Sequence, residues 1–487
     1  MKKVVIIGAG IGGLCTAILL AHAGYLVEIF EKNDTPGGKL FTLEQDGYRF
    51  TYGPSTLTMP DIYQQLLCAV DESPTELPYR QLHLNHRDVF ADGKTLEAKP
   101  DVAWMQDQLI AFHANDATNF ANYLSHVQRI EHKARIEFFS RDFTKLNDFI
   151  DPNVLMAMAQ VSPFTSMHDF HARYFQDPRI QMSFDRFATY VGSDPRKTPA
   201  TLAMIGALEY GQGVFRLEGG SQILVDTLMR IAKKKGVTFH FGARVDQLLQ
   251  QNKKIIGIEI AAVKYPADAV IFNGDRTLWR NLLIPKKQRT AQIPVLSSIP
   301  RSFSGFVLLL GVRKQYAILD HHTVFFPSDY TGEFTSIFQE NALPKDPTIY
   351  ISYSGFHEKT DAPDGGSNLF VLVNVPAKKR TKEEWQAYED HILDLLTHRC
   401  GLTDLRHHLE VVVRFTPDDL EQRTGAFEGS IYGRVSHGYH AFLRPGLQTS
   451  QFRNLFFVGG SNHPGGGTPM VALGARLVAN LVQRRLD

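Results

Sequence analysis

The pattern of apolar positions at the start of the chain predicts a strand, a turn, a helix and a second strand in direct succession. Val4 to Ile7 is a continuous β-branched run, which is typical of a strand buried on both faces. Leu14 to Ala23 carries apolar residues at helical spacing, and Gly24 provides a stop signal. Leu26 to Phe30 forms a second apolar run. This order is that of a parallel α/β unit.

Two later stretches have the same character and are expected to join the same unit. Near the middle of the chain, a helix is predicted over Gln222 to Lys235, followed by two strands, a polar turn at 250–254, another strand and a further short buried strand. Near the end, a buried strand runs into a glycine-rich loop, and a helix is predicted from about Ala472 to Arg485. The predicted strands are Val237 to Phe241, Ala243 to Leu249, Asp268 to Phe272 and Asn454 to Gly460.

The remaining segments interrupt this unit. Residues 63–216 are mostly helical in pattern, whereas residues 301–427 contain strand-like runs such as Gly305 to Val312, Thr348 to Tyr353 and Asn368 to Val375. We therefore expect an α/β fold. Its discontinuous Rossmann-like domain comprises residues 1–62, 217–300 and 428–487, with a helical segment at 63–216 and an inserted α+β domain at 301–427.

Composition narrows the class of protein. The chain has 487 residues, of which 43% are hydrophobic, enough for a large core. Its 52 Lys and Arg against 51 Asp and Glu leave a net charge of +1, which argues against nucleic acid as a partner. The 3 cysteines, Cys15, Cys68 and Cys400, are far apart, so no disulfide framework or cysteine metal site is expected. A reducing cytoplasm fits this usage.

The first residues also resemble a signal peptide, because Lys2 and Lys3 precede an apolar run and Ala21-His22-Ala23 mimics a cleavage site. The glycines in this stretch favour a nucleotide fold instead. No window offers ~20 uninterrupted apolar residues, so a membrane-spanning helix is not expected. Peripheral attachment to a membrane is compatible with this pattern.

A G-x-G-x-x-G motif lies between the first strand and the first helix, at Gly8, Gly10 and Gly13. Gly8 permits the tight turn, Gly10 lets a pyrophosphate approach the backbone, and Gly13 allows close packing of helix on strand. Glu31 ends the second strand, 18 residues beyond Gly13, where a carboxylate accepts hydrogen bonds from ribose hydroxyls. An acid there disfavours a 2′-phosphate, and hence NADP.

Two further glycine-rich segments complete the predicted cofactor site. In Pro36-Gly37-Gly38-Lys39, glycines expose backbone N–H groups and Lys39 is able to reach a phosphate. The loop 459–471 leads into the last helix, whose N-terminus presents N–H groups to a pyrophosphate or to flavin oxygens. Its alternative reading is a surface loop. His463 is either part of the site or a loop histidine held by backbone contacts, and no catalytic base is nominated.

These motifs resemble the FAD-binding fingerprint of the flavin amine oxidase and phytoene desaturase superfamily, so FAD is favoured over NAD. Nearly the whole chain is similar to the phytoene desaturase family of carotenoid enzymes, on the motifs GAGIGGL, DGYRFTYGPSTLTMP, GVFRLEGG and FVGGSNHPGGGTPM. Desaturases commonly carry Thr-His-Pro-Gly-Ala-Gly near the end, whereas this chain has Asn-His-Pro-Gly-Gly-Gly at 462–467. That form looks more like the C30 diaponeurosporene oxygenase branch.

The resemblance implies a set of cofactor-binding residues. They are Gly8, Gly10, Ile11, Gly12, Gly13, Glu31, Lys32, Gly37, Gly38, Lys39, Gly53, Pro54, Ser55, Val245, Gly459, Gly460, Met470 and Val471. In the superfamily, the backbone at the position of Val245 meets the adenine, although plain core packing is the alternative role. The final loop has no cysteine, so FAD is expected to bind noncovalently. No metal site is expected, since His321-His322 and His407-His408 are adjacent pairs that point to opposite faces of a strand.

The resemblance also implies an activity: oxidation of the terminal methyl group of a C30 carotenoid such as diaponeurosporene to an aldehyde. The alternatives are a phytoene or diapophytoene desaturase, an amine or porphyrinogen oxidase, and a prenyl-binding chaperone that has lost the flavin. The intact glycines argue against the last. A second G-x-G-x-x-G is missing, so oxygen or a quinone is the expected electron acceptor.

A carotenoid substrate constrains the location of the enzyme. At ~0.8 kcal/mol per buried CH₂, a thirty-carbon chain holds roughly 20 kcal/mol of transfer free energy. We therefore expect a cytoplasmic protein docked peripherally on a membrane, with residues 63–216 as the membrane-facing part and Val154 to Phe164 as the patch. The alternative reading of that patch is a buried core helix.

Overall fold

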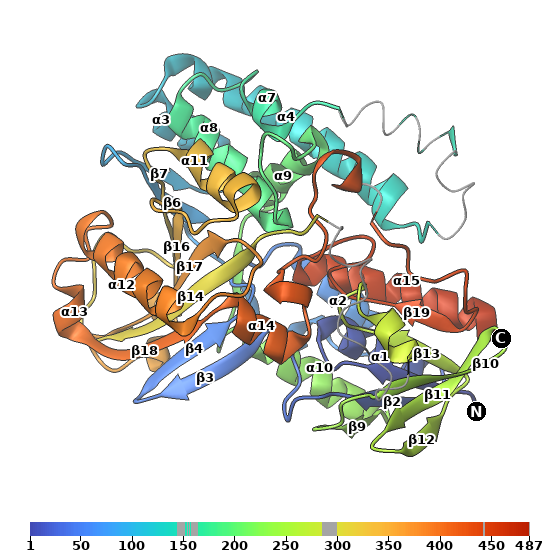
Figure 1. Ribbon diagram of the computed structural model, residues 1–487. Coiled ribbons are helices and arrows are strands. Elements are labelled where there is room, and N and C mark those ends of the chain that lie inside the picture. The colour runs from blue at the N-terminus through green and yellow to red at the C-terminus, as the bar shows by residue number, and fades with distance from the viewer. Residues whose placement is uncertain are drawn as a thin grey trace.

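The computed structural model describes residues 1–143, 151–152, 154, 156, 164–284, 300–441 and 444–486. Two sheets organise these residues, and helices cover them (Figure 1). The predicted patch at Val154 to Phe164 lies almost entirely outside the described residues; within it, Val154 is buried, whereas Met156 and Phe164 are exposed.

The first sheet is the predicted Rossmann-like unit. Its five parallel strands lie in the order β19-β13-β1-β2-β9. They are β1 (Lys3–Ile7), β2 (Leu26–Phe30), β9 (Thr238–His240), β13 (Ala269–Phe272) and β19 (Leu455–Phe457). Helix α1 (Ile11–His22) packs between α10 (Gln222–Lys234) and α15 (Thr468–Leu486), as Figure 1 shows. Buried aliphatic side chains from these elements form one continuous core.

The second sheet has seven strands in the order β18-β14-β17-β16-β15-β6-β7, antiparallel except for the β15–β6 pair. Its strands are β6 (His86–Val89), β7 (Thr95–Ala98), β14 (Ser304–Val312), β15 (His322–Phe325), β16 (Ile349–Tyr353), β17 (Ser367–Val375) and β18 (Leu409–Phe415). Helix α12 (Lys382–His398) packs Trp385 and Ile392 against the sheet. The hairpin of β3 (Phe41–Gln45) and β4 (Tyr48–Tyr52) packs Tyr48 and Phe50 against β14 and β17.

The segment 63–216 is mainly helical, as predicted, but it also supplies β6 and β7 to the second sheet. Its aromatic core is continuous with Val324 and Phe326 of that sheet. The two inserted segments therefore share one sheet, while the domain boundaries themselves stay a prediction. The helices are α3 (Val102–Ile110), α4 (Ala114–Ala134), η2 (Arg135–Phe139), α7 (Met167–His171), α8 (Pro178–Asp185), η3 (Arg186–Val191), η4 (Ala200–Met204) and α9 (Ile205–Gln212).

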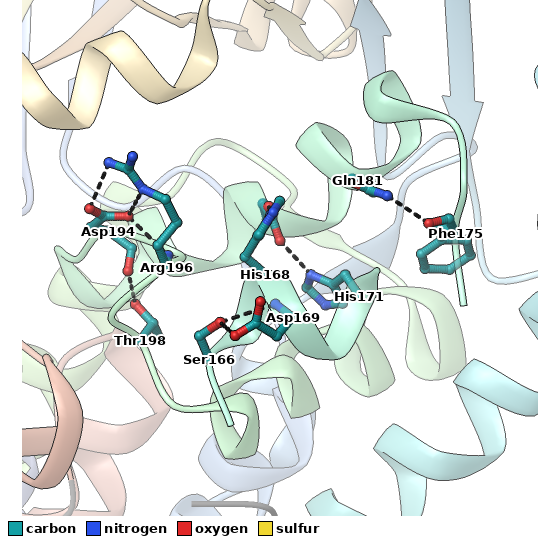
Figure 2. Close-up of polar contacts among 10 residues, drawn as sticks. Ser166, His168, Asp169, His171, Phe175, Gln181, Asp194, Arg196 and Thr198 are labelled. Carbon is teal, nitrogen blue, oxygen red and sulfur yellow. Dashed lines mark hydrogen bonds and ion pairs between the residues drawn. The ribbon is translucent and has the colours of Figure 1, made fainter. Parts of the chain in front are cut away.

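A shared carboxylate fixes the junction between α8 and η3. Figure 2 shows His168 and His171 on α7, and both imidazoles hydrogen-bond to Asp185, at 2.6 Å and 2.7 Å. Asp185 is almost fully buried, at 2% exposure. Because one carboxylate holds two side chains of a neighbouring helix, the start of η3 is held firmly against α7.

The remaining strands and α-helices connect these layers. They are β3 (Phe41–Gln45), β4 (Tyr48–Tyr52), α2 (Pro60–Cys68), β5 (Tyr79–Gln81), β8 (Phe215–Leu217), β10 (Gln247–Gln251), β11 (Lys254–Ile260), β12 (Val263–Pro266), α11 (Tyr330–Thr335), α13 (Leu405–His408) and α14 (Pro417–Thr424). None of the helices in the described part of the chain is both long and apolar enough to span a membrane.

One predicted strand is wrong in its extent. The strand expected from Ala243 to Leu249 begins only at Gln247. Ala243 instead donates its N–H to the carbonyl of Glu31 at 2.8 Å, and Val245 lines a cavity. Ala243 therefore hydrogen-bonds to the residue that follows β2 and is not part of β10.

Candidate functional site

A cavity of about 1360 Å³ lies between the two sheets and collects nearly all the predicted site residues. Its walls come from loops at the ends of β1, β2, β13 and β19, from α14 and η3, and from strands of the second sheet. This volume exceeds the ~300–1,000 Å³ of a typical small-molecule pocket. It can therefore hold an extended dinucleotide together with a further ligand.

Of the predicted cofactor-binding residues, all but Gly13 line this cavity: Gly8, Gly10, Ile11, Gly12, Glu31, Lys32, Gly37, Gly38, Lys39, Gly53, Pro54, Ser55, Val245, Gly459, Gly460, Met470 and Val471. The structure thus brings together segments from both halves of the sequence. Their individual contacts with a cofactor stay predictions.

Gly13 has the packing role expected of the third glycine. A Cβ atom there would lie 2.2 Å from the carbonyl oxygen of Gly8, so only glycine fits. Gly8 has a φ of +101° and donates its N–H to Phe30 at 2.8 Å. Helix α1 begins directly after Gly10, and no side chain caps it. Its first N–H groups therefore face the cavity as an anion-binding end.

Glu31 holds the first glycine loop against the end of β2. Its buried carboxylate accepts hydrogen bonds from the backbone N–H of Ala9 at 2.7 Å and from the side chain of Asn33 at 2.7 Å. The carboxylate is thus oriented by protein donors at the cavity wall. Asn33 fills both acceptor sites of Oε1, because its backbone N–H also donates to that oxygen, at 2.9 Å. Oε2 accepts from Ala9 and keeps a second acceptor site, so a ribose contact there is chemically compatible with this arrangement.

Lys32 and Lys39 line the same part of the cavity, but both ammonium groups already contact the protein. Lys32 donates to the carbonyl of Gln422 at 2.6 Å, and Lys39 donates to the carbonyl of Ile431. Burial lowers the pKa of both side chains. The phosphate contact predicted for Lys39 stays a prediction.

His463 anchors the second glycine loop to the helical segment. Its Nε2 contacts the carbonyls of Phe138 and Arg141 at 3.1 Å and 2.9 Å, and burial lowers its pKa to about 4. The backbone-held reading of this histidine is confirmed. The helix after the loop, α15, begins at Thr468, four residues before the predicted start, so its N-terminus reaches the cavity.

Sequence reasoning missed three residues that organise the glycine loops. The Asn273 amide donates to the carbonyl of Gly8 at 3.1 Å; Arg423 donates to the carbonyl of Gly38 at 3.3 Å; Arg444 donates to the carbonyl of Gly460 at 3.0 Å. Asn273 was detectable, because it ends a buried strand as Glu31 does. The two arginines stand in no recognisable local motif.

The cavity has a second, largely apolar part beside the second sheet. Ser55 and Tyr350 mark its border with the glycine loops, joined by a hydrogen bond of 2.6 Å between their hydroxyl oxygens. Its apolar lining includes Leu202, Met204, Ile205, Leu208, Phe303, Val307, Val324, Phe370 and Leu372. A polar, glycine-rich compartment thus opens on an apolar one, which fits a dinucleotide whose reactive end faces a hydrophobic ligand.

Comparison with known proteins agrees with this geometry. The model of the family described as flavin containing amine oxidoreductase matches residues 11–483. A 1-hydroxycarotenoid 3,4-desaturase of Flavobacterium sp. (strain P99-3) is 31% identical, over 99% of each chain. A 4,4'-diaponeurosporene oxygenase of Staphylococcus haemolyticus (strain JCSC1435) is 32% identical, over 99% of this chain and 97% of the relative.

Solved structures share the fold at lower identity. An oxidoreductase from Methanosarcina mazei aligns with a TM-score of 0.63 and 17% identity, over 98% of this chain and 100% of that one. Cyclohexylamine oxidase from Brevibacterium oxydans IH-35A aligns with a TM-score of 0.60 and 14% identity, over 100% of both chains. These similarities concern the arrangement of both sheets, since they span the whole chain.

Proposed function

The chain belongs to the family of flavin containing amine oxidoreductases, and from this premise we propose that it is an FAD-dependent carotenoid oxidoreductase that oxidises the terminal methyl group of a C30 carotenoid, such as diaponeurosporene, to an aldehyde. The observation that carries the proposal is an apolar compartment contiguous with a glycine-rich dinucleotide site. Full-length similarity to a diaponeurosporene oxygenase supports it.

FAD is the proposed flavin, since two glycine loops, Glu31 and a second helix N-terminus line one elongated site for both halves of a dinucleotide. Noncovalent binding is proposed because the described residues lining the cavity include no cysteine to form a thioether. Gly8, Gly10, Gly12 and Glu31 would hold the ADP half, with Gly53 to Ser55 and the loop 459–471 beside the flavin ring.

A bound flavin supplies a two-electron acceptor for a C–H bond of the substrate. The protein's part is to bind and orient the polyene and to exclude water, which the apolar lining does. Conversion of a methyl group to an aldehyde with oxygen from water removes four electrons, so the flavin would accept two electrons in each of two rounds and pass them to oxygen or a quinone. With oxygen from O₂, O₂ would itself be the oxidant, and its second atom would leave as water. No described residue is assigned as a general base.

Desaturation of a carotenoid is the second candidate. The 1-hydroxycarotenoid 3,4-desaturase is as similar to the chain as the oxygenase is, at 31% against 32% identity. Both reactions begin with removal of hydrogen from a polyene, so the same cavity serves either. The oxygenase product contains an added oxygen atom, whereas the desaturase product has only lost hydrogen, so the composition of the product distinguishes the two activities.

Substrate of this kind partitions into lipid, and we propose that the enzyme docks peripherally on the cytoplasmic face of a membrane. Exposed apolar side chains in the helical segment support this location: Ile136 is 50% exposed, Met156 56% and Phe164 99%. Side chains of this type insert into the interface between headgroups and acyl chains.

The deciding experiment is mass spectrometry of the products. Cells that make diaponeurosporene are supplied with the gene, and matched cells carry a Gly13→Val variant. A product heavier by one oxygen and lighter by two hydrogens identifies the aldehyde. A product that has lost pairs of hydrogen atoms without gaining oxygen would show a desaturase instead of an oxygenase. An unchanged polyene in cells that contain the flavin-loaded protein would overturn both proposed activities.

A further inference from the structure

A buried group of charged side chains borders the apolar compartment. Arg186 begins η3, is 5% exposed and lines the cavity, and its Nη1 donates to the Tyr190 hydroxyl at 2.9 Å. Tyr190 lines the cavity as well. Behind them lie His86, Asp88 and Glu209, all buried. We call these five residues the Arg186 cluster.

The Arg186 cluster is balanced in charge. His86 has a carboxylate oxygen at each ring nitrogen, Asp88 at 3.5 Å from Nε2 and Glu209 at 3.4 Å from Nδ1. Burial lowers the pKa of His86, but the two carboxylates outweigh burial and raise it above its ordinary value. Arg186 lies 3.9 Å from Glu209. The Nη2 atom of Arg186 also lies 3.3 Å from Nδ1 of His86. Two carboxylates therefore face Arg186 and His86, and no net positive charge is left for an anionic ligand.

The cluster adjoins the loop predicted to lie beside the flavin ring. The Tyr350 hydroxyl is 2.6 Å from Ser55 Oγ and 2.8 Å from Nδ1 of His322. Tyr350, His322 and His86 stand on β16, β15 and β6, which are neighbours in the second sheet. Polar side chains on these adjacent strands thus lie between the Gly53 to Ser55 loop and the cavity wall at Arg186.

The position of Arg186 is fixed by the residue before it. Asp185 is held by His168 and His171 of α7, the two imidazoles drawn in Figure 2. The guanidinium is consequently placed at the cavity by a junction that does not depend on a ligand. Such a preformed donor is characteristic of a recognition site, because a side chain that is already ordered loses little conformational entropy when the ligand binds.

A pure hydrocarbon gives no reason for this arrangement. Burying a guanidinium costs free energy unless its donors are all used. Within the part of the chain that the structure describes, Nε of Arg186 and both carboxylate oxygens of Glu209 have no hydrogen-bond partner of good geometry. These atoms are buried, so the Arg186 cluster holds polar capacity that the described residues do not fill, directly behind a cavity wall to which Arg186 and Tyr190 contribute.

We propose that Arg186 and Tyr190 bind a neutral oxygen, a hydroxyl or a carbonyl, at the end of an oxygenated polyene. This inference rests on the proposed function and names its substrate class more closely. Because the Arg186 cluster has no excess of positive charge, it favours a neutral oxygen over a carboxylate. The nearby Ser55–Tyr350 hydrogen bond places the oxygenated end of the polyene close to the loop proposed to lie beside the flavin ring. The apolar compartment holds the chain, and the cluster selects its end.

Binding measurements on the flavin-loaded enzyme test the inference. The probes are 4,4'-diaponeurosporene, its terminal alcohol and its terminal carboxylic acid in detergent micelles, titrated by quenching of tryptophan fluorescence. The alcohol is expected to bind about tenfold more tightly than the hydrocarbon, because a site that offers hydrogen bonds rejects an analogue without them. The acid is expected to bind more weakly than the alcohol.

Three variants locate the effect. Tyr190→Phe removes a cavity-lining hydroxyl, and Arg186→Lys keeps the charge balance but not the planar donor; both should reduce the preference for the alcohol to about threefold or less. Tyr210→Phe is the matched control, because Tyr210 is buried, its ring centroid lies 6.3 Å from that of His86, and it is not among the described residues that line the cavity. Its preference should equal that of the unmodified enzyme.

The outcomes separate the inference from the proposed function. Equal binding of hydrocarbon and alcohol would overturn the inference and leave the proposed function standing. Binding of no polyene by the flavin-loaded enzyme would overturn both. A preference that survives in Tyr190→Phe and Arg186→Lys, one lost equally in Tyr210→Phe, or a carboxylic acid bound most tightly would each overturn the assignment to a neutral oxygen at Arg186 and Tyr190.

Discussion

The side-chain amide of Asn273 donates a hydrogen bond to the carbonyl oxygen of Gly8 at 3.1 Å, across 265 residues of sequence. The same nitrogen lies 3.4 Å from the carbonyl of Gly10. One side chain at the end of β13 therefore fixes the turn between β1 and α1, on which the proposed dinucleotide site depends.

Replacing Asn273 by alanine should loosen that turn. The loss of its hydrogen bonds should lower the free energy of unfolding by about 1–2 kcal/mol and reduce the flavin retained after purification. Urea unfolding and the ratio of flavin to protein absorbance measure the two effects. Asn480→Ala is the control, since Asn480 is exposed on α15; equal flavin retention in both variants would contradict the role of Asn273.

Alanine at position 13 should be far more damaging than its high helix propensity implies. The new Cβ would meet the Gly8 carbonyl at 2.2 Å, so we expect a loss of about 3 kcal/mol or failure to fold. In Gly211→Ala on α9 the new Cβ would meet the end of the Gln128 side chain at 3.0 Å, which can move. That control should change stability by no more than about 1 kcal/mol in urea titrations. Similar losses in both variants would refute the packing argument.

Stability should fall on acidification partly because of His463. Its pKa in the folded protein is about 4, below the ~6.5 of an unfolded histidine, so between these values the unfolded chain binds more protons. The stabilising contribution is complete above pH 6.5 and is lost as the pH falls toward 4. From pH 7 to pH 5 the loss should be about 2 kcal/mol.

The measurement is urea unfolding of the unmodified protein and of His463→Gln at both pH values. The variant lacks the titrating group, so it should lose about 2 kcal/mol less over this interval. Identical pH dependence in the two proteins would show that His463 is not neutral in the fold.

Membrane docking predicts a localised effect of one exposed aromatic side chain. Phe164→Ser should reduce co-sedimentation with lipid vesicles severalfold, because Phe164 is 99% exposed in the helical segment. Val263→Ser is the control: Val263 is 54% exposed but lies on β12, in the sheet β10-β11-β12, which Figure 1 shows well away from helices α3 and α7 of the helical segment. Unchanged sedimentation of Phe164→Ser would remove this residue from the docking surface.

The local parts of the fold were predictable from sequence because their signals are local. β2 occupies Leu26–Phe30 as predicted, and the glycines of the first loop lie where a nucleotide motif requires them. By contrast, the pairing of β6 with β15 joins residues more than two hundred positions apart. Nothing in either short strand specifies that partner, so the shared sheet was not foreseen.

The site was predictable to the same extent. Backbone-shaping residues such as Gly13 and strand-end residues such as Glu31 carry a recognisable spacing. Arg186, Arg423 and Arg444 act through tertiary contacts with segments distant in sequence, and their surroundings arise only on folding. A buried arginine on a cavity wall has no sequence signature that separates it from a surface arginine.

The order of strands in the first sheet has a consequence for biosynthesis. β19 and α15 leave the ribosome after every other strand of that sheet, yet they supply one edge of it and one wall of the cavity. Since the nascent chain emerges N-terminus first, β1, β2, β9 and β13 emerge before the edge strand β19 that pairs with β13. The cavity therefore gains the wall formed by the loop 459–471 only after the earlier strands of the sheet have been synthesised.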